Sequence, residues 1–401
     1  MNKAFWKAGH RPTLLAAFLY FDLSFMVWVM LGPLGVAIAR DLQLSPAQKG
    51  LMVSVPVLAG ALFRLVFGLL VDRIKPRRTG LIGQCIVIAG LSVAWLLHVH
   101  SYSQVLLLGL LLGVAGASFA VALPLASRWY PPQFQGTALG LAGAGNSGTA
   151  LASLFAPGLA LAFGWNNVLG LAVLPLLFAL VFYWFNAKDS PQTPAPKPFS
   201  AYLEPLRSSD AWWFMCFYAV TFGGFVGLAS SLTIYFNDQY GVAPKLAGYM
   251  TAACVFAGSL VRPLGGALAD RIGGIRTLSV MYVIAAAALA VVGTNLPQAS
   301  QAVATFVVAM LALGMGNGAV FQLVPQRFRE QIGVMTGLVG MAGGVGGFFL
   351  GSSLGFARQL TGSYANGFYI FAGLSIVALV GLTRVKRRWR TTWGAALQAR
   401  I

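Results

Sequence analysis

Charged residues are scarce in this chain, and acidic residues are the scarcest. Only 9% of the 401 residues are charged, and 9 aspartates and glutamates stand against 27 lysines and arginines. Hydrophobic residues make up 58% of the chain. Too few polar side chains are present to cover a soluble globule of this size, so we expect an integral membrane protein surrounded by the lipid bilayer.

The residues of most catalytic and metal sites are missing as well. The three cysteines fall singly within apolar stretches, which indicates neither a disulfide framework nor a metal site. The sequence has no histidine cluster, paired carboxylates, Cys-x-x-Cys or phosphate-binding loop. We therefore expect no enzyme, no metal site and no bound cofactor.

Long apolar runs make up most of the chain. A helix of about 20 apolar residues crosses a hydrocarbon core of roughly 30 Å, and such runs recur from one end to the other. We expect an all-α protein with about twelve transmembrane helices. They are predicted near 13–39, 47–71, 79–98, 103–127, 136–162, 166–186, 212–236, 246–269, 277–295, 300–324, 333–357 and 365–383.

The net charge of +18 has a membrane explanation and does not indicate a nucleic-acid partner. Basic residues gather at both ends of the chain and in alternate loops, whereas the remaining loops hold only Arg40, Lys49, Lys245 and Arg358. Loops rich in lysine and arginine stay on the cytoplasmic side. We expect a multi-pass protein of the cytoplasmic (inner) membrane with both termini in the cytoplasm.

One cassette occurs twice, each time inside an apolar run. It reads Arg-x-x-x-Gly-x-x-x-Asp-Arg, and its two copies are Arg64, Gly68, Asp72, Arg73 and Arg262, Gly266, Asp270, Arg271. A glycine pattern repeats at nearly the same interval, as Gly136, Gly140, Gly143 and Gly333, Gly337, Gly340. We expect two parallel six-helix repeats, 1–186 and 211–401, joined by a cytoplasmic linker at 187–210. The site of such repeats lies at their interface near the membrane midplane.

Arg64 and Arg262 lie deep in the membrane in this arrangement. Each precedes by eight residues the aspartate that opens a cytoplasmic loop, which puts it roughly 12 Å further in. A buried arginine without a partner is costly, and Asp22 is the sole acid within a predicted helix. We expect an anionic substrate to be the missing partner, because a guanidinium fork suits a planar or tetrahedral oxyanion.

Specific motifs resemble a known family. Gly-x-x-x-Asp-Arg after the second and eighth predicted helices resembles the loop motif of the major facilitator superfamily. The stretch Gly143-Ala144-Gly145-Asn146-Ser147-Gly148 and the run from Gly340 to Phe349 resemble the paired nitrate signatures of the nitrate/nitrite porter family. The resemblance covers essentially the whole chain. It implies a major facilitator fold and a secondary transporter of nitrate, with nitrite as a further substrate, working by alternating access; we expect a monomer.

The resemblance also implies particular site residues. Arg64 and Arg262 resemble the family's nitrate-clamping pair, and Phe119, Tyr218 and Phe222 its aromatic residues around the anion. Tyr218 and Phe222 are four residues apart and share a helix face, and the tyrosine can donate a hydrogen bond. For Phe119 and Phe222, ordinary helix packing is the competing interpretation.

Three amides within the predicted helices need partners once they are buried. Asn146 lies in the glycine-rich stretch, and we assign it to the substrate site. Asn317 and Gln322, in the tenth predicted helix, either line the same path or bond across helices, and the sequence favours neither interpretation.

Glycines of the two signatures have two possible uses. Small residues let neighbouring helices approach closely, either to slide past each other or to pack without moving. Their place in the fifth and eleventh helices, which lie between the halves in this superfamily, favours sliding during a rocking cycle. The glycines concerned are Gly143, Gly145, Gly148, Gly340, Gly343, Gly344, Gly346 and Gly347.

The coupling mode stays open at this stage. Asp22 lies at a depth comparable with Arg64, where a carboxyl that binds and releases a proton would couple anion uptake to protons. It would otherwise be a fixed partner for Arg128 or a capping group. Nitrate/nitrite exchange is the alternative to proton symport.

Other classes of protein fit less well. A passive anion channel would also line its path with arginines, but the duplicated glycine-rich helices favour alternating access. A porter of another small anion is the runner-up within the transporter class.

Overall fold

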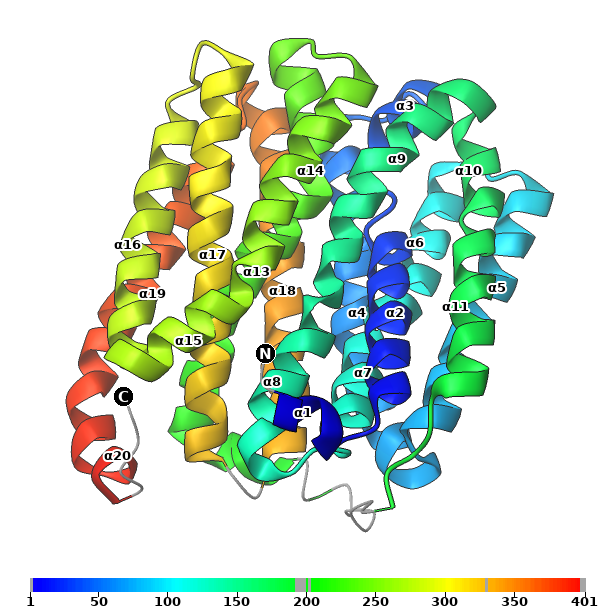
Figure 1. Cartoon of the computed structure of the whole chain (residues 1–401). Helices are drawn as coiled ribbons and strands as arrows, with labels where there is room; N and C mark the ends of the chain where they lie inside the picture. Colours follow the sequence, from blue (N-terminus) through cyan, green and yellow to red (C-terminus); the bar gives the residue numbers. More distant parts are fainter. Residues whose placement is uncertain (1–2, 192–199, 201–202, 329–330, 397–401) are drawn as a thin grey trace.

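The computed structural model describes residues 3–191, 200, 203–328 and 331–396, and regular structure in these ranges is helical throughout (Figure 1). The part before the predicted linker contains α1 (Lys3–Ala8), α2 (Arg11–Trp28), α3 (Gly35–Asp41), α4 (Pro46–Ile74), α5 (Pro76–Leu97), α6 (Tyr102–Gly116), α7 (Ser118–Ser127), α8 (Pro132–Gly143), η1 (Ala144–Ser147), α9 (Gly148–Phe163), α10 (Trp165–Leu171) and α11 (Val173–Asn186).

A second set of helices follows. It contains η2 (Glu204–Arg207), α13 (Ser209–Tyr240), α14 (Pro244–Leu260), α15 (Arg262–Ile272), α16 (Gly274–Gly293), α17 (Ala299–Arg327), α18 (Ile332–Thr361), α19 (Ala365–Thr391) and α20 (Trp393–Ala396). Within the predicted linker, residues 192–199 and 201–202 lie outside the described ranges.

Eleven helical stretches in the described ranges are long and apolar enough to cross a membrane. The first predicted span, 13–39, is instead divided into α2 and α3. Pro33 lies in the interruption, and proline disfavours helical geometry in the residue before it. That residue, Gly32, packs so closely on the Ser230 carbonyl of α13 that no side chain fits between them.

Several other spans are built from two helices in series. The span Ala138–Phe163 changes from α8 to α9 through the short 3₁₀ helix η1, within the glycine-rich stretch. The span Pro244–Ile272 is divided at Val261 into α14 and α15, and Arg262 is the first residue of α15. Both interruptions fall at residues that the sequence assigns to the site.

Helices of the two sets pack against each other at one end of the bundle. α4 packs along α18, and α9 packs along α14. At Gly50 and Gly355 the backbones of α4 and α18 touch, since a Cβ built on Gly50 would lie 2.8 Å from Gly355 Cα. This end lies opposite α1 and α20, which share the other end of the bundle (Figure 1).

Candidate functional site

Arg64 is almost completely buried on α4, with 1% of its surface exposed. Its Nε donates to the Gly116 carbonyl of α6 at 3.2 Å, and its Nη1 donates to the Gly340 carbonyl of α18. The second bond crosses from the N-terminal set of helices to the C-terminal set. Its Nη2 is buried without a hydrogen-bond partner in the described part of the chain. No carboxylate contacts this guanidinium there, as the acid count predicts.

Aromatic rings surround the same guanidinium. Its carbon lies 5.1 Å from the ring centres of both Phe119 and Phe222, 5.2 Å from Trp28 and 5.9 Å from Phe25. Rings at such distances stabilise a cation through their negative faces. The charge of Arg64 is therefore held by carbonyls and rings.

Arg262 is only partly buried at the start of α15. Its Nη2 donates to the Tyr218 hydroxyl at 3.3 Å, and its guanidinium carbon lies 5.4 Å from the Phe321 ring centre. Its Nη1 is buried, again without a partner among the described residues. Each arginine thus has one guanidinium nitrogen available to a ligand.

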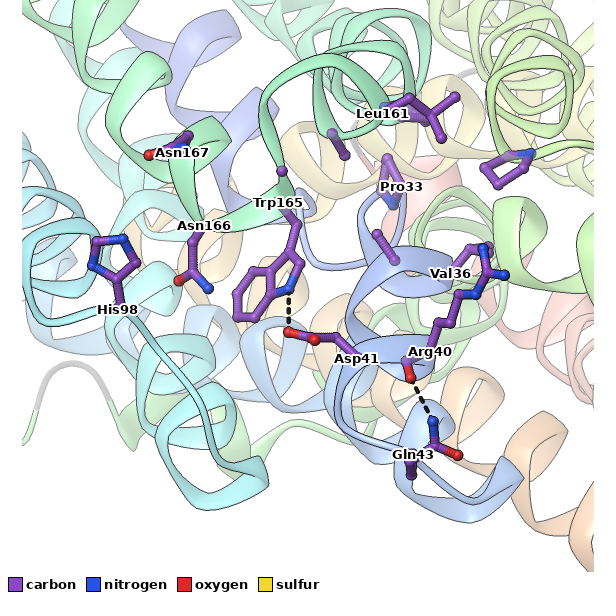
Figure 2. Close-up of a pocket in the computed structure, with 15 residues that line it drawn as sticks. Pro33, Val36, Arg40, Asp41, Gln43, His98, Leu161, Trp165, Asn166 and Asn167 are labelled. Carbon is purple, nitrogen blue, oxygen red and sulfur yellow. Dashed lines mark hydrogen bonds between the residues drawn. The ribbon is translucent and has the colours of Figure 1, made fainter.

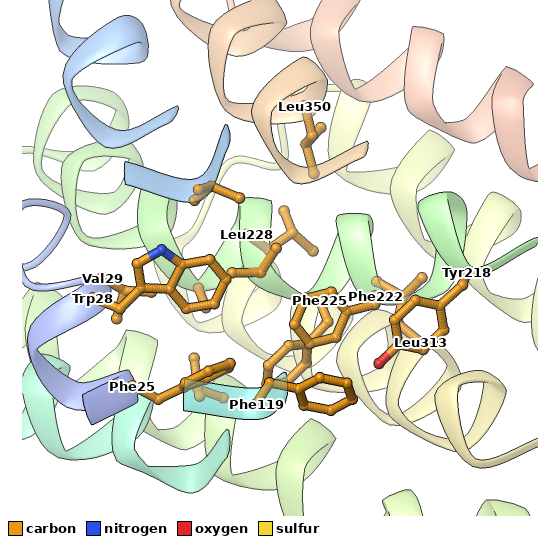
Figure 3. Packing of buried hydrophobic residues seen from close by; sticks show 14 of the residues in the cluster. Phe25, Trp28, Val29, Phe119, Tyr218, Phe222, Phe225, Leu228, Leu313 and Leu350 are labelled. Atoms are coloured by element: carbon orange, nitrogen blue, oxygen red, sulfur yellow. The ribbon is translucent and has the colours of Figure 1, made fainter. Parts of the chain in front are cut away.

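Four aromatic side chains lie between the two arginines and form a ring of contacts with them. Tyr218 and Phe222 stack at 5.1 Å with an interplanar angle of 5°, and Phe321 meets both Tyr218 and Phe119 edge to face. Figure 3 shows Phe119, Phe222 and Tyr218 gathered in this packing. We call the six residues the arginine–aromatic site; they are Arg64, Phe119, Tyr218, Phe222, Arg262 and Phe321.

Glycines of α18 cover this site. A Cβ built on Gly340 would lie 3.3 Å from Phe119, and one on Gly343 would lie 2.7 Å from Tyr218 and 2.8 Å from Phe222. The next glycines face other helices: Gly344 meets Ala61 of α4 at 2.6 Å, Gly347 meets Val57 of α4 and Val226 of α13, and Gly346 packs on the Ala219 carbonyl of α13. Only part of the second signature therefore faces the opposite half.

The first glycine signature makes different contacts from those expected of a sliding interface between the halves. Gly145 packs on Phe21 and Gly148 packs on the Asp22 carbonyl, both in α2 of the same half. A Cβ on Gly143 would meet no atom within 4 Å. The close approach allowed by Gly145 and Gly148 thus fixes two helices of the N-terminal half together.

The three amides occupy different environments. Asn146 is fully buried in η1, and neither its Nδ2 nor its Oδ1 has a hydrogen-bond partner within the described ranges. The same holds for Asn317 of α17. Gln322 faces α16, since its Oε1 would lie 2.5 Å from a Cβ built on Gly274. Asn317 and Gln322 thus lie in different surroundings, a difference that the sequence does not show.

Asp22 is buried in α2 with 6% of its surface exposed, and its Oδ1 accepts a hydrogen bond from Ser147 Oγ at 2.7 Å. Arg128, its alternative partner in the sequence, forms an ion pair with Asp72 of the first loop motif at 3.0 Å. The contacts of Asp22 are therefore with η1. Arg73 and Arg271, at the ends of α4 and α15, complete the repeated motif.

Sequence reasoning missed two parts of this environment. Phe321 lies four residues after Asn317 on the same helix face, and that spacing could have identified it. Trp28 donates from Nε1 to the Pro56 carbonyl at 2.7 Å, and its indole fills the space beside Gly60 and Gly116. Only the folded chain brings these glycines and the tryptophan together.

A groove of about 690 Å³ lies among residues of α3, α9 and α10 (Figure 2), at the end of the bundle opposite α1 and α20 (Figure 1). Arg40, Asp41, His98 and Trp165 are among its lining residues. Trp165 donates to Asp41 at 2.9 Å across it. None of the six residues of the arginine–aromatic site lines this groove.

The sequence is similar to those of known transport proteins. The Major Facilitator Superfamily profile matches residues 14–351. A probable nitrate/nitrite transporter NarK2 of Mycobacterium tuberculosis is 35% identical over 85% of this chain and 87% of its own. A probable nitrate/nitrite antiporter NarK1 of Thermus thermophilus is 32% identical over 90% of this chain and 88% of its own. A nitrite extrusion protein of Bacillus subtilis is 31% identical over 89% and 90%.

Solved structures agree on the fold. A bacterial homologue of the human lysosomal transporter Spinster, in an inward-facing and occupied conformation, superposes with a TM-score of 0.72 at 20% identity, covering 96% of this chain and 98% of that one. This chain therefore belongs to the major facilitator superfamily of membrane transporters, and within it to the nitrate/nitrite porter family.

Proposed function

We propose that this protein carries nitrate, and also nitrite, across the cytoplasmic membrane, with the anion held between Arg64 and Arg262. The observation that carries the proposal is the arginine–aromatic site, in which two arginines from different sets of helices contact one group of aromatic side chains without a carboxylate among the described residues. Relatives that are named as nitrate and nitrite transporters support the choice of anion.

The geometry of the site suits a small flat oxyanion. Arg64 Nη2 and Arg262 Nη1 are buried donors that lack partners in the described ranges, and Tyr218 supplies a hydroxyl. The faces of Phe119 and Phe222 flank the Arg64 guanidinium. The guanidinium donors suit an oxyanion. The rings of Phe119 and Phe222, packed closely on the Arg64 guanidinium, favour a small flat one over a bulky tetrahedral one.

The transport cycle follows from which end of the bundle is closed. We assign the end with α1 and α20 to the cytoplasm, on the basis of the charge distribution. The opposite, outer end is closed by the contacts of α4 with α18 and of α9 with α14. Gly140, Gly333 and Gly337 have open space beside them on the cytoplasmic side. This arrangement resembles an inward-facing state, from which the halves 1–186 and 211–401 rock around the site.

Proton symport through Asp22 is the coupling mode we favour. Asp22 is buried in a membrane-spanning region, and its hydrogen bond to Ser147 ties it to η1, next to Asn146. Nitrate/nitrite exchange is the second candidate. Two like charges in one site resist closure when no anion is bound, which favours a loaded return step, and one relative carries the name antiporter.

The test is transport by the purified protein in proteoliposomes. Nitrate uptake is measured in competition with nitrite, chlorate, sulfate and phosphate. Nitrite and chlorate should compete, whereas sulfate and phosphate should not. Equal competition by phosphate, or an absence of nitrate uptake under both proton-gradient and exchange conditions, would overturn the proposal.

A further inference from the structure

Asn317 is a buried polar side chain of the C-terminal half. It lies on α17 with none of its surface exposed, and both its Nδ2 and its Oδ1 lack hydrogen-bond partners in the described part of the chain. Burying an amide without partners costs roughly 1–3 kcal/mol by mutational measures. Such a group calls for a ligand or another polar partner.

Helix geometry gives the direction in which Asn317 points. Leu313 packs on Gly224 of α13, and Gly314 packs on the Gly258 carbonyl of α14. Asn317 lies one turn further on, four residues after the first and three after the second, so it projects between α13 and α14. Phe321 continues the same row four residues later and belongs to the arginine–aromatic site.

The orientation of α17 is fixed by close backbone packing. A Cβ built on Gly318 would lie 2.6 Å from Gly266 N, and Gly318 also meets the Arg262 carbonyl. These contacts leave no room for α17 to turn about its axis. Asn317 is thus held on the side of α17 where α13 supplies Tyr218 and α15 supplies Arg262.

Buried polar residues of membrane helices often form hydrogen bonds to a neighbouring helix. For the Asn317 amide, the partner would lie on α13 or α14. None is found there within the described ranges. The groups of this half that also lack partners include the Nη1 of Arg262, a donor that suits the amide oxygen. The backbone carbonyl of Arg262 packs on Gly318, the residue after Asn317.

We propose that Asn317 is a further contact of the transported oxyanion. Its Nδ2 donates to an anion oxygen from the C-terminal half, and its Oδ1 is left free to accept from Arg262 Nη1. This inference rests on the proposed function and deepens it, because a directional N–H donor selects an oxyanion over a halide of similar size.

The experiment compares Asn317→Leu with wild type in detergent, by calorimetric nitrate titration and by thermal unfolding. Leucine matches asparagine in size and removes both polar atoms. Replacing an amide that lacks protein partners should leave the unfolding temperature without anion unchanged or raised. Nitrate affinity should fall about ten- to hundredfold, the effect of losing one hydrogen bond to a charged group. Chloride inhibition should change less than twofold.

Gln322→Leu is the matched control, because it removes an amide from the same helix but on the side facing α16. Its nitrate affinity should equal that of wild type. If Asn317→Leu is not monodisperse, Asn317→Ser gives the same comparison with a shorter donor. Unchanged nitrate affinity in a folded Asn317 variant, or a lowered unfolding temperature with unchanged affinity, would overturn the inference. Failure of wild type itself to bind nitrate would refute the proposed function instead.

Discussion

Lys49 Nζ lies 2.8 Å from Asp238 Oδ2, and this ion pair joins the two halves of the transporter. The other three ion pairs found among the described residues, Arg128–Asp72, Arg327–Asp210 and Arg388–Asp210, each lie within one half. Tyr364 donates to the same Asp238 oxygen at 2.8 Å. The pair lies at the proposed outer end, near the contact of Gly50 with Gly355, and in the proposed cycle it would break when the site opens outward.

Breaking this pair should move the population toward the outward-open state. A partly exposed ion pair contributes up to about 1 kcal/mol, so Lys49→Met should raise outer accessibility by at most about fivefold. The measurement is maleimide labelling of Ser231→Cys, placed in a cysteine-free background. The charge swap Lys49→Asp with Asp238→Lys is the control and should restore slow labelling. A swap that labels as fast as Lys49→Met would show that the charges do not set the balance.

Replacing either site arginine by lysine should weaken nitrate binding at least about tenfold while leaving the fold intact. A lysine keeps the charge but loses the planar fork of donors. Arg64→Lys should be the more severe of the two, since it also loses the bonds to Gly116 and Gly340. Calorimetric titration of the monodisperse variants measures the effect, and near-normal affinity in either would rule out the clamp.

Gly343→Ala should abolish nitrate binding, because the added methyl would lie within 3 Å of Tyr218 and Phe222. Gly337→Ala is the matched control on the same helix, where a Cβ meets nothing within 4 Å. That change should keep transport and raise stability by about 0.5–1 kcal/mol, because alanine is the better helix former. Transport assays and thermal unfolding of both variants measure these effects, and similar behaviour of the two would show that the glycines serve only helix packing.

Asp22→Asn should make nitrate uptake insensitive to an imposed proton gradient, because an amide cannot bind and release a proton. In wild type, lowering the external pH should accelerate uptake. Exchange of nitrate for nitrate should survive the substitution, since that half-cycle needs no net proton movement. Uptake into liposomes with and without internal nitrite distinguishes the modes. Acceleration of wild type by internal nitrite alone, with no response to pH, would establish exchange.

The membrane class, the duplicated cassette and the family could all be predicted from the amino-acid sequence. It also assigned Arg64, Arg262, Phe119, Tyr218 and Phe222 to one site, and the structure places these five side chains together. Motif spacing was sufficient for this because each of them lies in a repeated or recognisable segment.

Partners that only tertiary packing brings together could not be predicted from the sequence. The carbonyls that accept from Arg64 belong to Gly116 and Gly340, which are far from it in the chain. Every residue type has a backbone carbonyl, so the sequence does not show which one is the acceptor. For the glycines of the fifth span, composition likewise shows that a close approach occurs and not which helix approaches; in the structure, α2 approaches Gly145 and Gly148. The interruption at Pro33, by contrast, could have been read from the sequence.

The 3₁₀ winding of Ala144–Ser147 makes the fifth span longer than a continuous α-helix of the same residues. A 3₁₀ residue rises about 2.0 Å and turns about 120°, against about 1.5 Å and 100° in an α-helix. Rewinding these four residues would shorten the span by about 2 Å and rotate α8 against α9 by about 80°. Because Gly145 and Gly148 fasten this turn and the start of α9 to α2, the displacement would pass to α8, whose Gly140 and Gly143 have free space beside them. Rewinding of η1 would therefore rotate the cytoplasmic half of the fifth span and draw it inward, while the outer half stays in place.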